Sequence, residues 1–288
     1  MYYEKSVVEW CEAHTDRYAI SPYISETTNT LSNLSFIYVA YLLSQQGAAA
    51  ASYAGVATSS LPLRPPACAE NVASNKLNIL FWRCNCVLVC VGLGSAIFHA
   101  TETFAGEIAD ELPMSVLMYY YLAIVCHIHK LQFPRAAYLG IVALGWSLYL
   151  MYRNHTIFLT LFACQLAIPV YITLEGTYGS LPNPPFPEQG GDTPLLRFAS
   201  FDRFAVKCVR STKSSLSGAG GSQGGRQSPC LCFAFASIVF GKACWLFERY
   251  LHTYQMCPEM SSPLYLLHSF WHLGAAFGHY WIMRCWMS

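Results

Sequence analysis

Charged side chains are scarce in this sequence. Only 11% of its 288 residues are charged and 54% are hydrophobic, whereas an ordinary soluble domain carries roughly 25% charged residues. The formal net charge is +1, and no basic stripe with interleaved aromatic residues is present. Because such a stripe is typical of nucleic-acid binding, we exclude DNA and RNA as partners. The composition predicts an integral membrane protein.

The sequence instead contains long apolar segments. A helix needs roughly 20 mostly apolar residues to cross the hydrocarbon core, and seven segments come close. They are approximately 27–45, 78–99, 109–128, 136–152, 156–174, 231–250 and 263–285. The expected fold is therefore all-α, a polytopic membrane protein with seven transmembrane helices, and residues 1–288 are expected to form one domain.

Two segments between the spans have a different composition. Residues at about 46–76 and 175–230 include PLRPP, PNPPFP and GAGGSQGGRQS. Such stretches carry too few apolar residues to bury a core. We expect mobile cytosolic loops there.

The distribution of Lys and Arg indicates the orientation. Basic residues favour the cytoplasmic side; four lie in the N-terminal segment and the even-numbered loops, and twelve lie in the odd-numbered loops, their flanks and the C-terminus. This asymmetry predicts a cytosolic C-terminus and an N-terminus in the lumen of a secretory organelle, the endoplasmic reticulum or the Golgi.

Polar residues gather at the non-cytosolic ends of three predicted spans. Ser95 and His99 end the second span, Asp110 falls in the first turn of the third, and His268 and His272 open the seventh. Three imidazoles with an open fourth position are typical of a catalytic zinc site, which would leave Ser95 and Asp110 for the chemistry. Histidines that only hydrogen-bond within the core, with Asp110 as a helix cap, are the alternative.

The N-terminal segment holds a second polar feature. Glu26 begins a stripe that continues with Asn29 and Asn33 at helical spacing, and the preceding stretch EWCEAHTD is acidic. Oxygen-rich clusters suit a hard cation such as Ca²⁺. A solvated acidic segment is the alternative.

Most of the 13 cysteines fall within spans, where a free Cys packs as a small hydrophobic residue. Cys11 and Cys257 lie in non-cytosolic segments, where a disulfide can persist. Spacing alone cannot pair them.

Together these motifs resemble the alkaline ceramidases, which belong to a superfamily of seven-span proteins that also includes the progestin and adiponectin receptors. The matching stretches are WCE at 10–12, SPYISETTNTLSN at 21–33, GSAIFHA at 94–100, DELPM at 110–114 and HSFWHL at 268–273. The resemblance implies hydrolysis of the amide bond of ceramide to a sphingoid base and a fatty acid.

The resemblance also assigns site residues. It makes His99, His268 and His272 zinc ligands and gives catalytic roles to Ser95 and Asp110. For calcium it implies Glu9, the carbonyl of Trp10, Glu12 and Glu26.

The chain departs from the family pattern at several positions. The stretch AHTDRYAI is a few residues longer than in the family, so the expected Asn ligand for calcium has no counterpart, and we assign Asp16 in its place. Thr27 and Thr28 replace an aromatic pair, and the acidic residue expected late in the sixth span is Glu248.

These assignments lead to a mechanism and to two rival classes. Asp110 would act as general acid and base, and Ser95 would donate a hydrogen bond to the developing oxyanion; a Ser nucleophile is the alternative. A site buried among spans favours a lipid substrate that arrives from the bilayer. The rivals are a hydrolase of another lipid amide or ester, and a seven-span receptor with a structural metal.

Overall fold

The computed structural model describes residues 4–16, 20–57, 68–133, 135–178 and 224–287. Within these ranges the chain forms helices and isolated bridges but no strand. The elements are α1 (Cys11–Asp16), α2 (Thr27–Ser32), α3 (Leu34–Ala57), α4 (Cys68–Thr101), α5 (Phe104–Ile128), α6 (Arg135–Tyr152), α7 (His155–Tyr178), α9 (Gly224–Thr253), the 3-10 turn η3 (Pro263–Leu266) and α10 (Leu267–Met287). The all-α prediction is confirmed.

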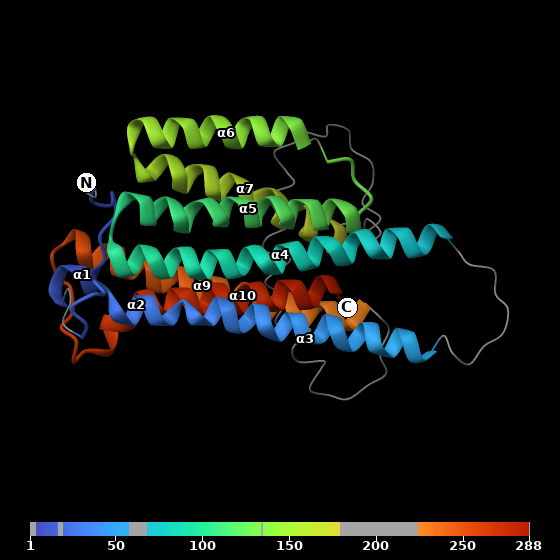
Figure 1. The fold of residues 1–288 in the computed structure, drawn as a ribbon, viewed down its shortest axis with the longest axis horizontal. Coiled ribbons are helices and arrows are strands. Elements are labelled where there is room, and N and C mark those ends of the chain that lie inside the picture. The colour runs from blue at the N-terminus through green and yellow to red at the C-terminus, as the bar shows by residue number, and fades with distance from the viewer. Residues whose placement is uncertain (1–3, 17–19, 58–67, 134, 179–223, 288) are drawn as a thin grey trace, which may run out of the picture.

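Seven long helices of the described chain run side by side, as Figure 1 shows, and they correspond to the seven predicted spans. Four of them contain segments long and apolar enough to cross a membrane, namely Lys76–Thr101, Phe104–Ile128, His155–Glu175 and Pro229–Thr253. Large apolar side chains also point outward: Trp82, Ile141 and Leu144 expose 67%, 67% and 62% of their surface. A helix that is apolar on all sides is typical of a membrane span, so the chain is a polytopic membrane protein.

The two predicted loops are shorter than expected. Helix α3 continues to Ala57 and α4 begins at Cys68, so only 58–67 of the first loop lies outside the described residues. The run GAAAAS is mostly alanine, which has the highest helix propensity, and this explains the extension of α3. The second loop is likewise bounded by Tyr178 and Gly224, and residues 179–223 lie outside the described part.

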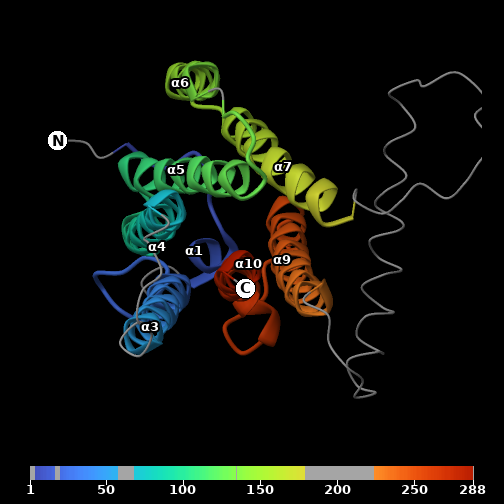
Figure 2. The same ribbon diagram turned by 90° about the vertical axis from the view of Figure 1, so that its right-hand side faces the viewer.

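The packing places α10 among α2, α3 and α9, while α5 lies between α4 and α7 and α6 packs on α7 at the edge (Figure 2). Small residues bring two helix pairs together. A Cβ on Gly94 would lie 1.9 Å from the Ala109 carbonyl oxygen, and one on Gly274 would lie 2.8 Å from the Gly241 Cα. Such close approach is typical of helix pairs in membranes, and at Gly94 it brings α4 against α5 beside the polar residues.

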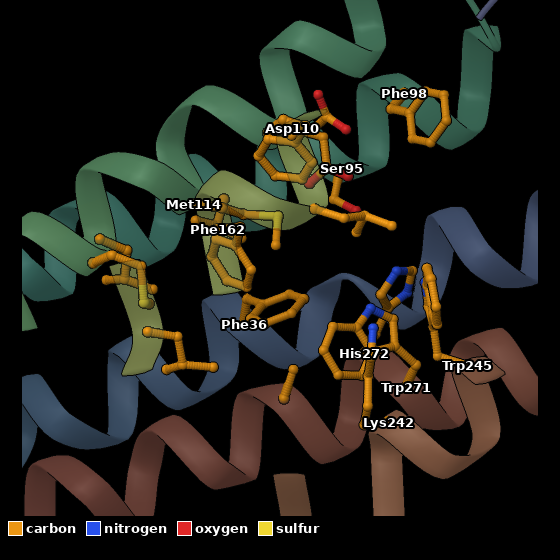
Figure 3. Close-up of a pocket in the computed structure, with 18 of the residues that line it drawn as sticks. Phe36, Ser95, Phe98, Asp110, Met114, Phe162, Lys242, Trp245, Trp271 and His272 are labelled. Carbon is orange, nitrogen blue, oxygen red and sulfur yellow. The ribbon is translucent and has the colours of Figure 1, made fainter. Parts of the chain in front are cut away.

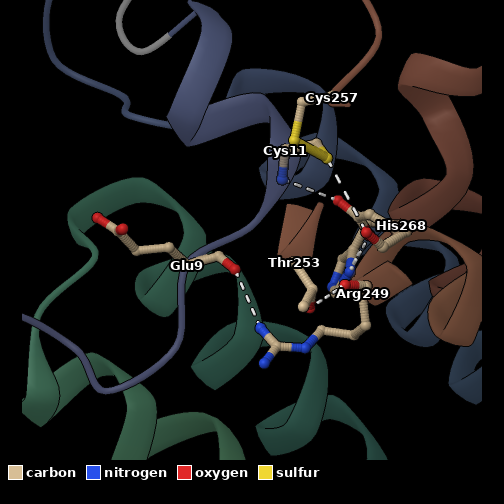
Figure 4. The surroundings of a disulfide bond; sticks show 7 residues. Glu9, Cys11, Arg249, Thr253, Cys257 and His268 are labelled. Carbon is tan, nitrogen blue, oxygen red and sulfur yellow. Dashed lines mark hydrogen bonds and ion pairs between the residues drawn. A yellow bond between two sulfur atoms is a disulfide. The ribbon is translucent and has the colours of Figure 1, made fainter. Parts of the chain in front are cut away.

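The N-terminal arm, residues 4–16, crosses the end of the bundle. It pairs with the α4–α5 connection through the Ser6 N–H, which donates to the Glu102 carbonyl at 3.0 Å, and through the Phe104 N–H, which donates to the Glu4 carbonyl at 2.9 Å. A disulfide joins Cys11 of the arm to Cys257 in the segment between α9 and η3 (Figure 4). The bridge that spacing alone could not assign therefore closes the arm over the helix ends.

Candidate metal centre and active site

Three imidazoles converge at the end of the bundle that the arm covers. The ring centroids of His99, His268 and His272 lie 4.8, 5.0 and 4.7 Å apart in pairs. Each of the three residues exposes 3% of its surface or less, and one candidate ligand atom from each ring lies within 4.8 Å of the others. The structure thus brings the residues of α4 and α10 together as predicted.

Each ring of this His triad has a partner behind it. The Nδ1 atom of His99 contacts the Glu26 carboxylate, the Nδ1 of His268 lies 2.9 Å from Glu248 Oε2, and the Nδ1 of His272 lies 2.7 Å from Ser32 Oγ. All three Nδ1 atoms are engaged, which leaves the three Nε2 atoms for one ion. Outer partners of this kind orient metal-binding histidines and raise their basicity, so the residues fit a bound metal.

The arm and α2 hold these outer partners in position. Glu248 also accepts the Cys11 N–H on Oε1 at 3.1 Å, so a disulfide-bonded residue of the arm contacts the partner of His268. The Glu12 carboxylate accepts the backbone N–H groups of Thr28 at 2.8 Å and Asn29 at 3.0 Å in the first turn of α2. Helix starts carry unpaired N–H groups, and Glu12 satisfies two of them.

Ser95 and Asp110 lie beside the triad. Both residues line the cavity that the triad also lines, and Figure 3 shows the pair on one wall of this cavity with His272 on another. The prediction that Asp110 lies in the first turn of its helix is wrong. Thr103 caps α5 by accepting the Gly106 N–H at 3.1 Å. The helix therefore begins at Phe104, and Asp110 and Pro113 lie inside it.

The cavity has a volume of about 550 Å³ and includes the His triad, Ser95 and Asp110 in its wall. Most of its other lining is apolar, with side chains such as Phe36, Met114, Phe162, Trp245 and Trp271. Lys242 also lines it, with its Nζ 3.4 Å from the centroid of the Trp245 ring. A mostly apolar cavity with a few convergent polar groups is the usual form of a ligand site.

The predicted calcium ligands that the structure describes each have another partner. Glu9 forms an ion pair with Lys5, Glu12 caps α2 and Glu26 pairs with His99, while the Trp10 carbonyl accepts the His14 N–H at 3.1 Å. The side chain of Asp16 lies outside the described residues. Helix capping and histidine pairing thus engage Glu12 and Glu26 in the described part of the chain, and calcium binding stays a prediction.

The polar stripe of the first span does face the interior, since Glu26, Asn29 and Asn33 each expose 1% of their surface. Asn29 accepts a hydrogen bond from Ser269 of α10 at 3.1 Å. The stripe thus joins α2 to the helix that carries His268 and His272.

A second cluster was not predicted. Glu107 and Glu111 of α5 and His155 of α7 have candidate ligand atoms within 4.8 Å of one another, and all three line the cavity. The i, i+4 spacing in GEIADE was the available signal, because residues at this spacing share a helix face. His155 could not be placed beside it, since nothing in the spacing relates α7 to α5.

Comparisons with known proteins show the family of this chain. A profile of the Ceramidase family matches residues 2–287. The protein named "Putative alkaline ceramidase dcd3A" of Dictyostelium discoideum is 24% identical over 272 residues, which cover 92% of this chain and 80% of that protein. "Alkaline ceramidase YPC1" of Saccharomyces cerevisiae is 27% identical over 196 residues, which cover 61% of this chain and 50% of the yeast protein. Because the family match spans nearly the whole sequence, this chain belongs to the ceramidase family and is an amidohydrolase.

Proposed function

We propose that this protein hydrolyses the amide bond of ceramide in a zinc-dependent reaction and releases a sphingoid base and a fatty acid. The observation that carries the proposal is the His triad, oriented by three outer partners, in the same apolar cavity as the Ser95–Asp110 pair. The names of the relatives, both alkaline ceramidases, point to the same substrate class.

The triad would hold the zinc ion through the Nε2 atoms of His99, His268 and His272. Zinc bound by three protein ligands lowers the pKa of a coordinated water to about 7 and polarises a carbonyl. The donor set supports this assignment, because three neutral imidazoles are a known catalytic zinc set that leaves a fourth position open.

Asp110 would be the group that moves protons. Its carboxylate would accept the proton of the attacking water and deliver it to the amide nitrogen as the C–N bond breaks, so that the sphingoid base leaves as a neutral amine. General acid and base catalysis of this kind contributes roughly 10²–10⁴-fold in rate. Ser95 lines the same cavity, and its hydroxyl would orient the carboxylate before the substrate enters.

The proposed role of Ser95 is to stabilise the oxyanion. In the transition state its hydroxyl would donate to the oxygen of the amide carbonyl as negative charge develops there. Donors of this type are effective in a site from which water is excluded, and Ser95 exposes only 3% of its surface.

The cavity fits a lipid. Aromatic and aliphatic side chains line it on α4, α5, α7, α9 and α10, and no large polar surface would oppose the burial of two hydrocarbon chains. The amide of a ceramide lies between its chains and its hydroxyl-bearing head, which matches a polar site at the end of an apolar cavity.

The protein is proposed to lie in the endoplasmic reticulum or Golgi membrane with a lumenal N-terminus and a cytosolic C-terminus. The excess of Lys and Arg in the odd-numbered loops supports this orientation. The Cys11–Cys257 disulfide supports it independently, since both cysteines lie at the proposed lumenal end and disulfides persist in oxidising compartments.

A lipid panel tests the proposal. Purified protein with its zinc content measured would be given ceramide, other lipid amides and a lipid ester, and fatty acid release would be followed. We expect ceramide to be hydrolysed, and Asp110→Asn to abolish most of that activity without loss of zinc. A zinc-containing sample that releases no fatty acid from ceramide would refute the proposal, and release only from another lipid would change the substrate class.

A further inference from the structure

The cluster of Glu107, Glu111 and His155 has no role in the proposed reaction. Glu107 and Glu111 expose 1% and 3% of their surface, and the side chain of His155 exposes 18%. His155 Nδ1 lies 3.0 Å from Glu111 Oε1 and 3.7 Å from Glu107 Oε1. The three groups come from the first two turns of α5 and the first turn of α7, at the end of the bundle that the arm covers (Figure 1).

The charge of this cluster is not balanced by a basic side chain. In the described part of the chain, the ion pairs of both carboxylates are with His155 alone. The neighbouring Arg153 forms its ion pair with Glu4 and lies over the Phe104 ring. Two buried carboxylates beside one imidazole carry net negative charge even when the imidazole is protonated, and buried charge of this kind is costly unless a cation compensates it.

Three atoms of the cluster are also without a hydrogen-bond partner among the described residues. They are Glu111 Oε2 and both ring nitrogens of His155, of which Nδ1 lies within ion-pair distance of the two carboxylates. Glu111 is buried and lines the cavity, so this oxygen is directed into enclosed space and not into solvent. Buried acceptors are nearly always satisfied in native proteins, and an unsatisfied one points to a ligand.

The two carboxylate oxygens of Glu107 hold the site in position. Glu107 accepts the Val7 N–H on Oε2 at 2.7 Å and the Tyr149 hydroxyl on Oε1 at 2.9 Å. Its carboxylate is therefore fixed by the arm and by α6, and each oxygen keeps a further lone pair for an ion. Carboxylates that are themselves hydrogen-bonded are usual among metal ligands.

We infer that Glu107, Glu111 and His155 form a second binding site for a divalent transition-metal cation, separate from the His triad. Two carboxylates and one imidazole are a mixed oxygen and nitrogen donor set, which suits ions such as Zn²⁺ and Mn²⁺. The ion neutralises the buried carboxylates and connects α5 to α7 beside the cavity.

Metal stoichiometry tests the inference without reference to activity. The full-length protein would be purified in detergent, stripped with a chelator, reloaded with Zn²⁺, separated from free metal and analysed for zinc per chain. We expect two equivalents in the wild type and one in Glu111→Gln. His155→Gln is a second near-isosteric variant with the same expectation, and Glu259→Gln, in the exposed segment between α9 and η3, is the matched control that should keep both equivalents.

The outcomes for the two sites are distinguishable. His268→Gln should remove the equivalent held by the triad and leave the one that depends on Glu111. Equal zinc content in the wild type, Glu111→Gln and His155→Gln, with all three eluting as folded protein, overturns the second site and leaves the proposed reaction untouched. Loss of zinc in Glu111→Gln but not in His268→Gln supports the second site and contradicts the zinc triad.

Discussion

Replacing Glu248 with Gln tests whether the outer partners set the affinity of the His triad for metal. Glu248 Oε2 lies 2.9 Å from His268 Nδ1, and its Oε1 accepts the Cys11 N–H at 3.1 Å. A carboxylate can accept both hydrogen bonds, but the amide of Gln has one acceptor oxygen and one donor nitrogen. Either His268 or Cys11 would then face a donor, and the ring would also lose the negative charge that raises its basicity.

The expected magnitude follows from similar partners in other metal sites. Loss of such a group typically lowers metal affinity about 10- to 100-fold, which corresponds to about 1.4–2.8 kcal/mol. The fold should survive, because Gln has nearly the same shape and Glu248 exposes only 2% of its surface, so no new cavity is opened.

The assay is a competitive titration of zinc against a chelator of known affinity, on purified protein in detergent. Glu259→Gln is the control, because Glu259 is exposed and, among the described residues, only its backbone carbonyl forms a hydrogen bond, with the Ser262 N–H. If Glu248→Gln and Glu259→Gln bind zinc within twofold of each other at the triad, the outer partner does not tune the metal and our reasoning is wrong.

Three further predictions concern the active site and the helix contact behind it. Asp110→Asn should lower kcat for ceramide by about 10²–10⁴ with unchanged zinc content; a loss of zinc instead would mean that Asp110 is a ligand. Ser95→Ala should lower kcat by about 10²–10³ with little change in KM, and a change in KM alone would contradict an oxyanion role. Gly94→Ala should lower the thermal midpoint, because its Cβ would lie 1.9 Å from the Ala109 oxygen and overpacking costs about 1–3 kcal/mol. Gly140→Ala has nothing within 4 Å and should be neutral or stabilising by up to about 1 kcal/mol; equal midpoints for the two variants would refute the close contact.

The parts of this protein that sequence reasoning could predict are those encoded by local spacing. Apolar length located the seven long helices, and the i, i+4 pairs Ser95–His99 and His268–His272 shared a helix face as expected. The alternating direction of successive spans then predicted that both pairs lie at one end of the bundle, without any contact information. Their convergence followed because two helices whose polar faces lie at the same depth have few other ways to bury those faces.

Contacts between helices could not be predicted in the same way. Spacing did not show that Glu26 would pair with His99 or that Ser32 would contact His272, because the rotation of one helix about its axis relative to another depends on the whole core. For the same reason spacing did not show that Glu12 would cap α2. The sequence alone could not assign a role to His155, because only the packing of α7 against α5 places it beside Glu111.

The most direct test of the zinc centre is an anomalous-scattering measurement at the zinc absorption edge on crystals of active protein. We predict a peak about 2.0–2.1 Å from the Nε2 atoms of His99, His268 and His272, next to the cavity that contains Asp110. No peak among these three rings, in a sample that hydrolyses ceramide, would contradict the metal-dependent reaction proposed for this enzyme.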